Sequence, residues 1–379
     1  MNRARVALLA LIVLTLQGCA TIRRMPFTEA QQIVAVIPGI PDARFWADEP
    51  GAGRRMATSF ISGAGEKTML ALSGGSDKGA FGAGLLNGWT LAGTRPEFSI
   101  VTGVSTGALI APFAFLGSDQ DAELKRLYTT ISAKDVYRTR FVLAIPGSPS
   151  AASTKPLERL IASAATDALI DRVAREHARG RRLFIGTANL DAQRMVIWNM
   201  GAIAASKAPN RYALFRQVLL ASSAIPGVFP PVMIQAEAGG RPISEMHVDG
   251  GTTAQILALP DDALSSDNPG AAARPRHIYL IVNGKLNGEF KLVTPKTIPI
   301  ASQSFGLSLR SSLVDTIDLN YLYAQAHGLA FSLSFIPKDY PTRDTKLFDT
   351  ASMQALYDYG LNLGQGGDFW VKQPPGQSE

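Results

Sequence analysis

Short apolar runs alternate with longer stretches of helical periodicity along most of the chain. A short apolar run bounded by glycine or polar residues is typical of a buried strand, whereas apolar positions three or four residues apart indicate a helix. These patterns predict strands at residues 68–72, 98–102, 182–187, 195–198, 246–248, 277–282 and 331–336. They predict helices at residues 80–91, 108–116, 155–175, 212–222, 311–330 and 352–363.

This alternation of strands and helices predicts an α/β layered domain with a largely parallel sheet. We expect the catalytic core to span residues 66–290 and residues 291–379 to form a helical and strand extension packed on it. Pro112 should kink its helix or confine it to a short piece. The polar stretch 262–276, which contains glycine and proline, is typical of a surface loop.

The first residues follow a different pattern. A basic start at residues 2–5 precedes an apolar run from Val6 to Leu16. This run is shorter than the roughly 20 apolar residues of a spanning helix and is typical of a secretory signal. The segment Leu16-Gln17-Gly18-Cys19 then resembles the lipobox of bacterial lipoproteins, although Gln17 departs from the small or apolar residue usual there. We therefore expect residues 1–18 to be a lipoprotein signal peptide.

Cys19 is the one cysteine of the chain, so no internal disulfide can form, and its position suits lipid attachment. Acyl chains there would anchor the protein, since each buried methylene contributes about 0.8 kcal/mol. Ala20 follows, which by resemblance to enterobacterial lipoproteins indicates the outer membrane of the cell envelope. Residues 19–65, rich in proline and glycine, are expected to form a tether. The alternative is an ordinary signal peptide with an incidental cysteine.

Composition narrows the function classes. The 379 residues are 46% apolar and 18% charged, which favours a globular protein with a large core. The net charge of +6 lies in scattered arginines without interleaved aromatic residues, so nucleic-acid binding has no support, although weak attraction to an anionic lipid surface remains open. One cysteine and four scattered histidines give no pattern for a metal site.

The first candidate for chemistry is the pentapeptide Gly103-Val104-Ser105-Thr106-Gly107. It lies between a predicted strand and a predicted helix, which is the context of a nucleophile elbow. There Ser105 would be exposed at the carboxyl end of the strand, near a helix N-terminus that favours developing negative charge. The alternative is a structural turn with a capping serine.

A glycine-rich loop, Ser73-Gly74-Gly75-Ser76-Asp77-Lys78-Gly79, follows the strand at 68–72. It has neither Walker nor dinucleotide-binding spacing, although successive backbone amides could still bind a phosphate. The same amides could serve as an oxyanion hole. A purely structural turn is the third possibility.

A nucleophilic serine needs a base, and His177, His247, His277 and His327 show no clear triad pattern. His177 should lie at an exposed helix end, and His277 should lie at the sheet edge opposite the site. Asp249, in Asp249-Gly250-Gly251 after a short strand, is the better candidate because its carboxylate could reach Ser105 directly. On its own, however, an Asp-Gly-Gly segment is very common and indicates an ordinary structural turn.

Taken together, these segments resemble the patatin-like phospholipase family. The resemblance rests on four blocks in the family's order and covers about residues 67–282. The blocks are the loop 74–79, the elbow 103–107, the proline-containing block 221–232 and the turn 249–251. We expect the block 221–232 to be structural, packing beside the site.

The resemblance implies a three-layer α/β/α sandwich of the patatin and cytosolic phospholipase A2 type. It implies a Ser105–Asp249 dyad without histidine, with backbone amides of Gly74, Gly75 and Ser76 holding the oxyanion. It also implies lipid acyl esters as substrates and no metal or organic cofactor. Two departures affect the loop: Ser76 replaces a glycine, and Lys78 replaces the usual arginine, keeping the charge without the planar fork.

We therefore expect a serine lipid acyl hydrolase of the phospholipase A, lysophospholipase or esterase type, acting at a membrane surface. Two alternatives stay open. One is a non-catalytic envelope lipoprotein that binds lipids or partners on a hydrolase fold. The other is a Ser-Asp-His triad esterase in which His277 or His327 would be essential.

Overall fold

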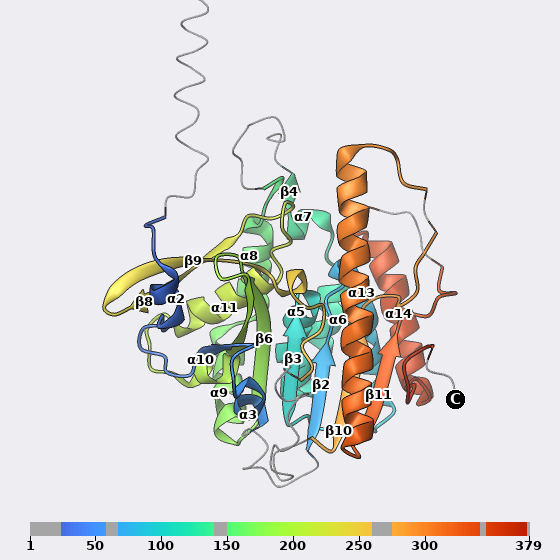
Figure 1. Ribbon diagram of the computed structural model, residues 1–379. Coiled ribbons are helices and arrows are strands. Elements are labelled where there is room, and N and C mark those ends of the chain that lie inside the picture. The colour runs from blue at the N-terminus through green and yellow to red at the C-terminus, as the bar shows by residue number, and fades with distance from the viewer. Residues whose placement is uncertain are drawn as a thin grey trace, which may run out of the picture.

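The structure is a computed structural model that describes residues 24–57, 67–139, 150–259, 275–290, 292–341 and 346–376. It has a mixed central sheet with helices on both faces (Figure 1). The described strands of this sheet are β1 (Arg44–Trp46), β2 (Thr68–Leu72), β3 (Ile100–Val104), β6 (Arg182–Asn189), β7 (Arg194–Asn199), β8 (Val232–Ala238), β9 (Arg241–Asp249), β10 (His277–Val282) and β11 (Ala330–Phe335). A separate small pair is formed by β4 (Arg138–Thr139) and β5 (Ala152–Ser153).

The strand order places the predicted parallel strands at the centre. Strands β6, β3, β2, β10 and β11 are parallel neighbours in that order. On the other side of β6, β7 and then β1 are added antiparallel, and the β8–β9 hairpin joins the end of β6 through β9. The carboxyl ends of β2 and β3 therefore meet at one edge of the sheet, where ligands bind in open α/β sheets.

Helices cover both faces of the sheet, as a three-layer fold requires. Alternate residues of β2 point to opposite faces: Leu70 and Leu72 join one large core of buried side chains, whereas Ala71 joins a second core on the other face of the sheet. The described helices are α2 (Glu29–Ile33), α3 (Ala52–Ala57), α4 (Gly79–Leu91), α5 (Thr106–Leu116), α6 (Asp121–Thr129), α7 (Ala133–Val136), α8 (Lys155–Ala164), α9 (Asp167–Ala178), α10 (Met200–Ala205), α11 (Arg211–Ser222), α13 (Thr297–Ala326) and α14 (Thr350–Gly366).

Three of the predicted elements differ from the structure by more than a few residues. The helix expected at 155–175 is two helices, because Thr166 caps a new helix by accepting a hydrogen bond from the Leu169 amide. The strand expected at 246–248 begins at Arg241, as half of a hairpin that short-range apolar patterning did not show. Helix α13 begins at Thr297 rather than at 311, and residues 300–308 of its additional turns are all exposed, so they have no buried face to produce a pattern.

Part of the expected tether belongs to the folded domain. Strand β1 pairs with β7, and Arg44 forms a buried ion pair with Glu245 of β9. Residues 1–18 and Cys19 lie outside the described residues, as does most of the loop expected at 262–276. Among the helices that the structure describes, none is both long and apolar enough to cross a membrane.

Candidate active site

Ser105 occupies a strained turn between β3 and α5. Its backbone has φ 56° and ψ −124°, in the left-handed half of conformational space that a residue with a side chain rarely adopts. Such a conformation costs about 1–3 kcal/mol and persists only where the surroundings enforce it. The turn therefore has the geometry of a nucleophile elbow.

The glycines on either side of Ser105 let the helix approach the sheet closely. A Cβ on Gly103 would lie 2.4 Å from the carbonyl oxygen of Gly107, and a Cβ on Gly107 would lie 2.2 Å from that of Leu72. No larger residue fits either position without moving the backbone. The spacing of the pentapeptide is thus a packing requirement of the turn.

Ser222, the last residue of α11, holds the elbow from the other side. Its hydroxyl accepts a hydrogen bond from the Ser105 amide at 3.0 Å and donates one to the Gly186 carbonyl at 2.7 Å. The block 221–232 thus has the structural role expected of it, but the sequence did not identify Ser222 as the residue that fixes the elbow.

Asp249 ends β9 and faces Ser105. Its Oδ2 accepts a hydrogen bond from Ser105 Oγ at 2.6 Å, and its Oδ1 accepts one from the Gly251 amide at 2.8 Å. Its own amide donates to the Ala224 carbonyl at 2.9 Å. The structure therefore brings together the two side chains that the sequence proposed as nucleophile and base.

Burial sets the acid–base character of this pair. Ser105 is 8% exposed and Asp249 is 5% exposed. Removal from water raises the pKa of Asp249 to about 7, although the hydrogen bonds from Ser105 and Gly251 favour its charged form. A carboxyl group with a pKa near neutrality can both accept and return a proton at neutral pH.

Three of the four histidines lie toward the edge of the sheet that is opposite to Ser105. His277 is the first residue of β10, and His327 and His177 lie at the ends of helices that lead into the amino ends of β11 and β6. Ser105 lies at the carboxyl end of β3, which is the opposite edge. His177 is half-buried against Gly201 rather than exposed, contrary to expectation, and burial lowers its pKa to about 4.

His247 is close to Asp249 in sequence, but its ring points elsewhere. Its Nδ1 lies 3.0 Å from the Thr187 hydroxyl, and its Nε2 lies 3.2 Å from a carboxylate oxygen of Glu245. Burial lowers the pKa of His247. Both ring nitrogens are therefore engaged in a buried polar network beside the site and are not directed at Ser105.

The glycine-rich loop lies directly against Ser105. A Cβ on Gly74 would come 3.2 Å from the Ser105 Cβ. The Gly74 amide, however, donates to the Gln255 carbonyl at 2.8 Å, so it is not available to an oxyanion in this conformation. Within the described residues, the amides of Gly75 and Ser76 have no acceptor, so Gly74 is the one expected oxyanion donor whose amide is already engaged.

Asn283, immediately after β10, fixes the shape of this loop. Its amide donates to the Ser73 hydroxyl at 2.9 Å, and its side chain donates to the Ser73 carbonyl at 2.9 Å and accepts from the Gly82 amide at 3.1 Å. A Cβ on Gly75 would lie 2.1 Å from the Asn283 carbonyl oxygen. Sequence reasoning did not identify this residue, which is 210 positions from its partner Ser73.

The two residues of the glycine-rich loop that depart from the family pattern, Ser76 and Lys78, differ in their surroundings. Ser76 has φ 57°, so the position that is usually glycine does require a left-handed backbone. The Ser76 hydroxyl is buried and has no hydrogen-bond partner among the described residues. Lys78 is exposed.

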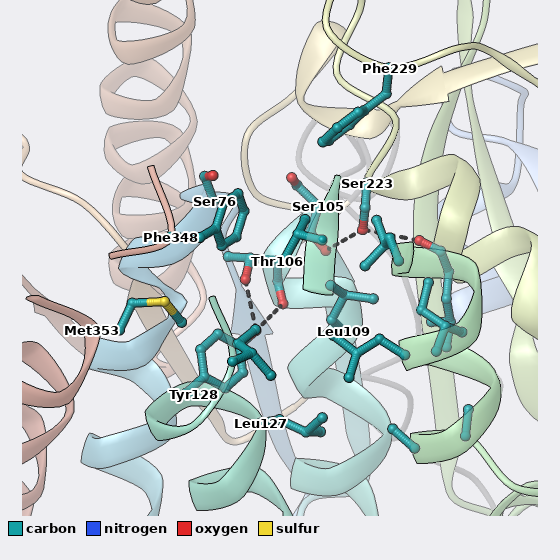
Figure 2. A pocket seen from close by; sticks show the side chains of 18 of the residues that line it. Ser76, Ser105, Thr106, Leu109, Leu127, Tyr128, Ser223, Phe229, Phe348 and Met353 are labelled. Carbon is teal, nitrogen blue, oxygen red and sulfur yellow. Dashed lines mark hydrogen bonds between the residues drawn. The ribbon is translucent and has the colours of Figure 1, made fainter. Parts of the chain in front are cut away.

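An apolar cavity opens beside Ser105. It holds about 800 Å³ of space, part of it open to solvent, and lies between α5, α6, α8 and α11. Figure 2 shows Ser105 and Ser76 at one end of this cavity, with Leu109, Leu127 and Tyr128 further inside. Its lining is mainly aliphatic and aromatic and includes Leu109, Leu127, Leu160, Ile161, Phe229 and Phe348. Such a lining fits a hydrocarbon chain better than a polar group.

The match to a known family follows from the same part of the chain. A family profile described as patatin-like phospholipase matches residues 70–262, about half of the chain, and includes both Ser105 and Asp249. The chain belongs to the patatin-like phospholipase family. Membership confirms the α/β/α fold expected for this patatin domain and supports lipid acyl hydrolase activity in general.

The two other comparisons give no further information about the function of this patatin domain. Among solved structures, the crystal structure of VipD from Legionella pneumophila is similar over 80% of this chain and 68% of that chain, with 12% identity and a TM-score of 0.39. No curated protein sequence matches the chain. Across the described residues, no cluster of three or more histidine, cysteine, aspartate or glutamate side chains could hold a metal ion.

Proposed function

We propose that this patatin-like protein is a serine lipid acyl hydrolase of the phospholipase A, lysophospholipase or esterase type, with Ser105 as nucleophile and Asp249 as base. The observation that carries the proposal is the 2.6 Å hydrogen bond from Ser105 Oγ to Asp249 Oδ2 at the end of an apolar cavity. A serine hydroxyl is a weak nucleophile until an adjacent base accepts its proton.

In the acylation step, Ser105 Oγ attacks the carbonyl carbon of the ester while its proton moves to Asp249. The carbonyl oxygen becomes an oxyanion, which we expect the amides of Gly75 and Ser76 to stabilise. Each well-aligned donor of this kind contributes about 3–4 kcal/mol to the transition state. Collapse of the tetrahedral intermediate breaks the ester bond, and Asp249 gives the proton to the departing alkoxide.

Deacylation repeats these steps with water as the nucleophile. Asp249 accepts a proton from the water as it attacks the acyl-Ser105 ester, and the proton returns to Ser105 Oγ as the fatty acid leaves. The pKa of about 7 suits both roles, because the carboxyl group changes protonation state twice in each half-reaction near neutral pH.

The apolar cavity beside Ser105 is the evidence that the acyl chain is the part of the substrate that becomes buried. Its walls offer apolar contact along α5, α6 and α8, and the few polar atoms lie near Ser105, where the ester group must sit. The alcohol or headgroup would then leave toward solvent. These features favour lipid esters over water-soluble metabolites as substrates.

We also propose that the protein acts as a lipoprotein of the outer membrane. The support is the sequence Leu16-Gln17-Gly18-Cys19, with Ala20 after the cysteine. Metabolic labelling with a palmitate analogue tests the attachment, since label should enter the full chain and should be lost in Cys19→Ser. Equal labelling of both chains would overturn the proposed attachment site.

The hydrolase proposal is tested by Ser105→Ala. We expect release of fatty acid from phospholipid and from a soluble ester to fall to the uncatalysed rate, with the circular dichroism spectrum unchanged. Activity that survives this substitution would refute the assignment. His277→Ala and His327→Ala serve as controls: both should retain activity, whereas a triad mechanism would require one of them.

A further inference from the structure

Helix α13 is much longer than the strands that it connects. It joins β10 to β11, parallel neighbours of six residues each, whereas α13 has 30 residues. A helix of that length spans about 45 Å, and a six-residue strand spans about 20 Å. A helix that only crossed back over the sheet would need about half that length.

The excess lies at the active-site edge of the sheet. Since α13 follows β10, it begins beyond the carboxyl ends of the parallel strands, and it ends where β11 starts. Figure 1 shows its first turns rising past the ends of β2 and β3. Ser105 and the glycine-rich loop at Gly74 lie at these carboxyl ends of β3 and β2.

The two halves of α13 differ in burial. In the C-terminal half, Leu313, Ile317 and Ala324 are buried in the core beneath the helix. In the N-terminal half, every residue from 300 to 308 is exposed. The first half is therefore a helix that projects from the domain without a packed face among the described residues.

This projecting segment carries large apolar side chains. Ile300 is 50%, Phe305 41% and Leu307 55% exposed, and the segment that leads into the helix adds Phe290 at 98% and Leu292 at 86%. A cluster of exposed apolar side chains on one projecting element marks an interaction surface. We call residues 290–308 the apolar arm.

The charge of this region indicates which kind of surface the apolar arm can bind. The apolar arm contains Lys291 and Lys296 and no aspartate or glutamate, and Arg310 follows it two residues later. Apolar side chains interspersed with cationic ones match the interface of an anionic lipid bilayer, where hydrocarbon and negative headgroups are both present. A second copy of the arm would instead bring like charges together.

We propose that the apolar arm inserts into an anionic lipid surface and holds the cavity mouth beside Ser105 against that surface. The part of this proposal that concerns substrate delivery rests on the proposed hydrolase activity, whereas the binding itself does not. This contact would be separate from any acyl chains on Cys19, because it is made by residues 290–308, which are far from Cys19 in the sequence.

A site-specific fluorophore tests the insertion directly. In the full chain carrying Cys19→Ser, an environment-sensitive dye is attached to Ser304→Cys in the arm or to Gln325→Cys in the packed half of α13, both exposed positions. Vesicles of phosphatidylglycerol and phosphatidylethanolamine should raise the emission intensity of the dye at position 304 several-fold and shift its emission to shorter wavelength. The emission of the dye at position 325 should not change. An unchanged signal at 304 would overturn the proposal, as would an equal response to phosphatidylcholine vesicles.

Matched substitutions separate binding from catalysis. Phe305→Ser with Leu307→Ser should abolish vesicle binding and reduce vesicle hydrolysis, while hydrolysis of a monomeric short-chain ester stays unchanged. Leu319→Ser with Leu322→Ser, exposed on the packed half, should affect none of these. Loss of monomeric ester hydrolysis in the arm variant would instead indicate a lid. A concentration-dependent dye response without vesicles would indicate a second copy, and each of these two results contradicts the proposal.

The two proposals fail in different ways. A protein that responds to vesicles at 304 but hydrolyses no ester would refute the hydrolase and leave the lipid-binding arm intact. A protein that hydrolyses esters without a response at 304 would do the reverse.

Discussion

The buried carboxyl group of Asp249 should make the folded protein less stable as pH rises from acid to neutral. Its pKa is 3.8 in water and about 7 in the folded protein, chiefly because the side chain is buried. Below pH 4 both the folded and the unfolded chain bind the proton. Between pH 4 and 7 only the folded chain keeps it, so the free energy of unfolding falls as pH rises.

The magnitude follows from the difference between the two pKa values. Each unit corresponds to about 1.36 kcal/mol, so a difference of about three units corresponds to about 4 kcal/mol, lost by pH 7 and unchanged above it. This is a large part of the roughly 5–15 kcal/mol that stabilises a typical domain. Asp249→Asn does not titrate and retains an oxygen to accept the Gly251 hydrogen bond. The variant should therefore gain stability relative to the wild type by up to about 4 kcal/mol between pH 4 and 8.

Urea unfolding of both proteins at several pH values measures this difference. Ser105→Ala is the matched control, because it is also inactive but keeps the carboxyl group. Without the Ser105 hydrogen bond, which favours the charged form of Asp249, its stability should fall with rising pH at least as much as that of the wild type. The wild-type kcat/KM should rise with pH and level off above about 7, since only the carboxylate can accept the Ser105 proton. A stability difference between wild type and Asp249→Asn that does not change from pH 4 to 8 would refute the reasoning.

Three further substitutions test the surroundings of the dyad. Ser76→Gly should raise the free energy of unfolding by about 1 kcal/mol in urea titrations and retain activity, because it relieves a φ of 57° and keeps the amide donor; a loss of stability would contradict this. Ser222→Ala should lower the free energy of unfolding by about 1–3 kcal/mol and lower kcat, because it leaves the Ser105 amide and the Gly186 carbonyl unpaired. Unchanged kinetics would show that these two hydrogen bonds of Ser222 are dispensable for catalysis. Ile161→Trp should shift the preferred acyl length toward shorter chains in a series of soluble esters, because Ile161 lines the cavity, whereas an unchanged preference would place the chain elsewhere.

The turn at Ser105 could be predicted from the sequence because its signal is local, whereas Asp249 was predicted from its place among four blocks that resemble the patatin-like family. A Gly-x-Ser-x-Gly segment between a strand and a helix specifies its own turn, and the structure shows that turn at Ser105. The absence of a convincing histidine directed attention to Asp249, and the structure places its carboxylate next to the serine. The catalytic roles of both residues stay predictions.

Residues that act through distant contacts could not be predicted. Ser222 and Ser105 are 117 positions apart, and Asn283 and Ser73 are 210 apart, so their hydrogen bonds exist only after the sheet has assembled. The expected oxyanion donors included Gly74 for the same reason, since no local signal shows that its amide is already bound to Gln255.

The start of α13 was missed for a different physical reason. Helical periodicity in a sequence reflects a buried face, and the first turns of α13 have none within the described residues. Strand β1 was similarly hidden in a segment rich in proline and glycine, because three residues are too few to show a period.

Covalent labelling of the serine tests the proposed dyad most directly. The full chain is treated with a fluorophosphonate, and the modified residue is identified by mass spectrometry of its peptides. We expect one label, on Ser105, that is absent in Ser105→Ala, forms much more slowly in Asp249→Asn and is unaffected in His277→Ala and His327→Ala. A folded wild-type chain that takes no label at Ser105 would contradict a nucleophilic serine and would support a protein that binds lipids without hydrolysing them.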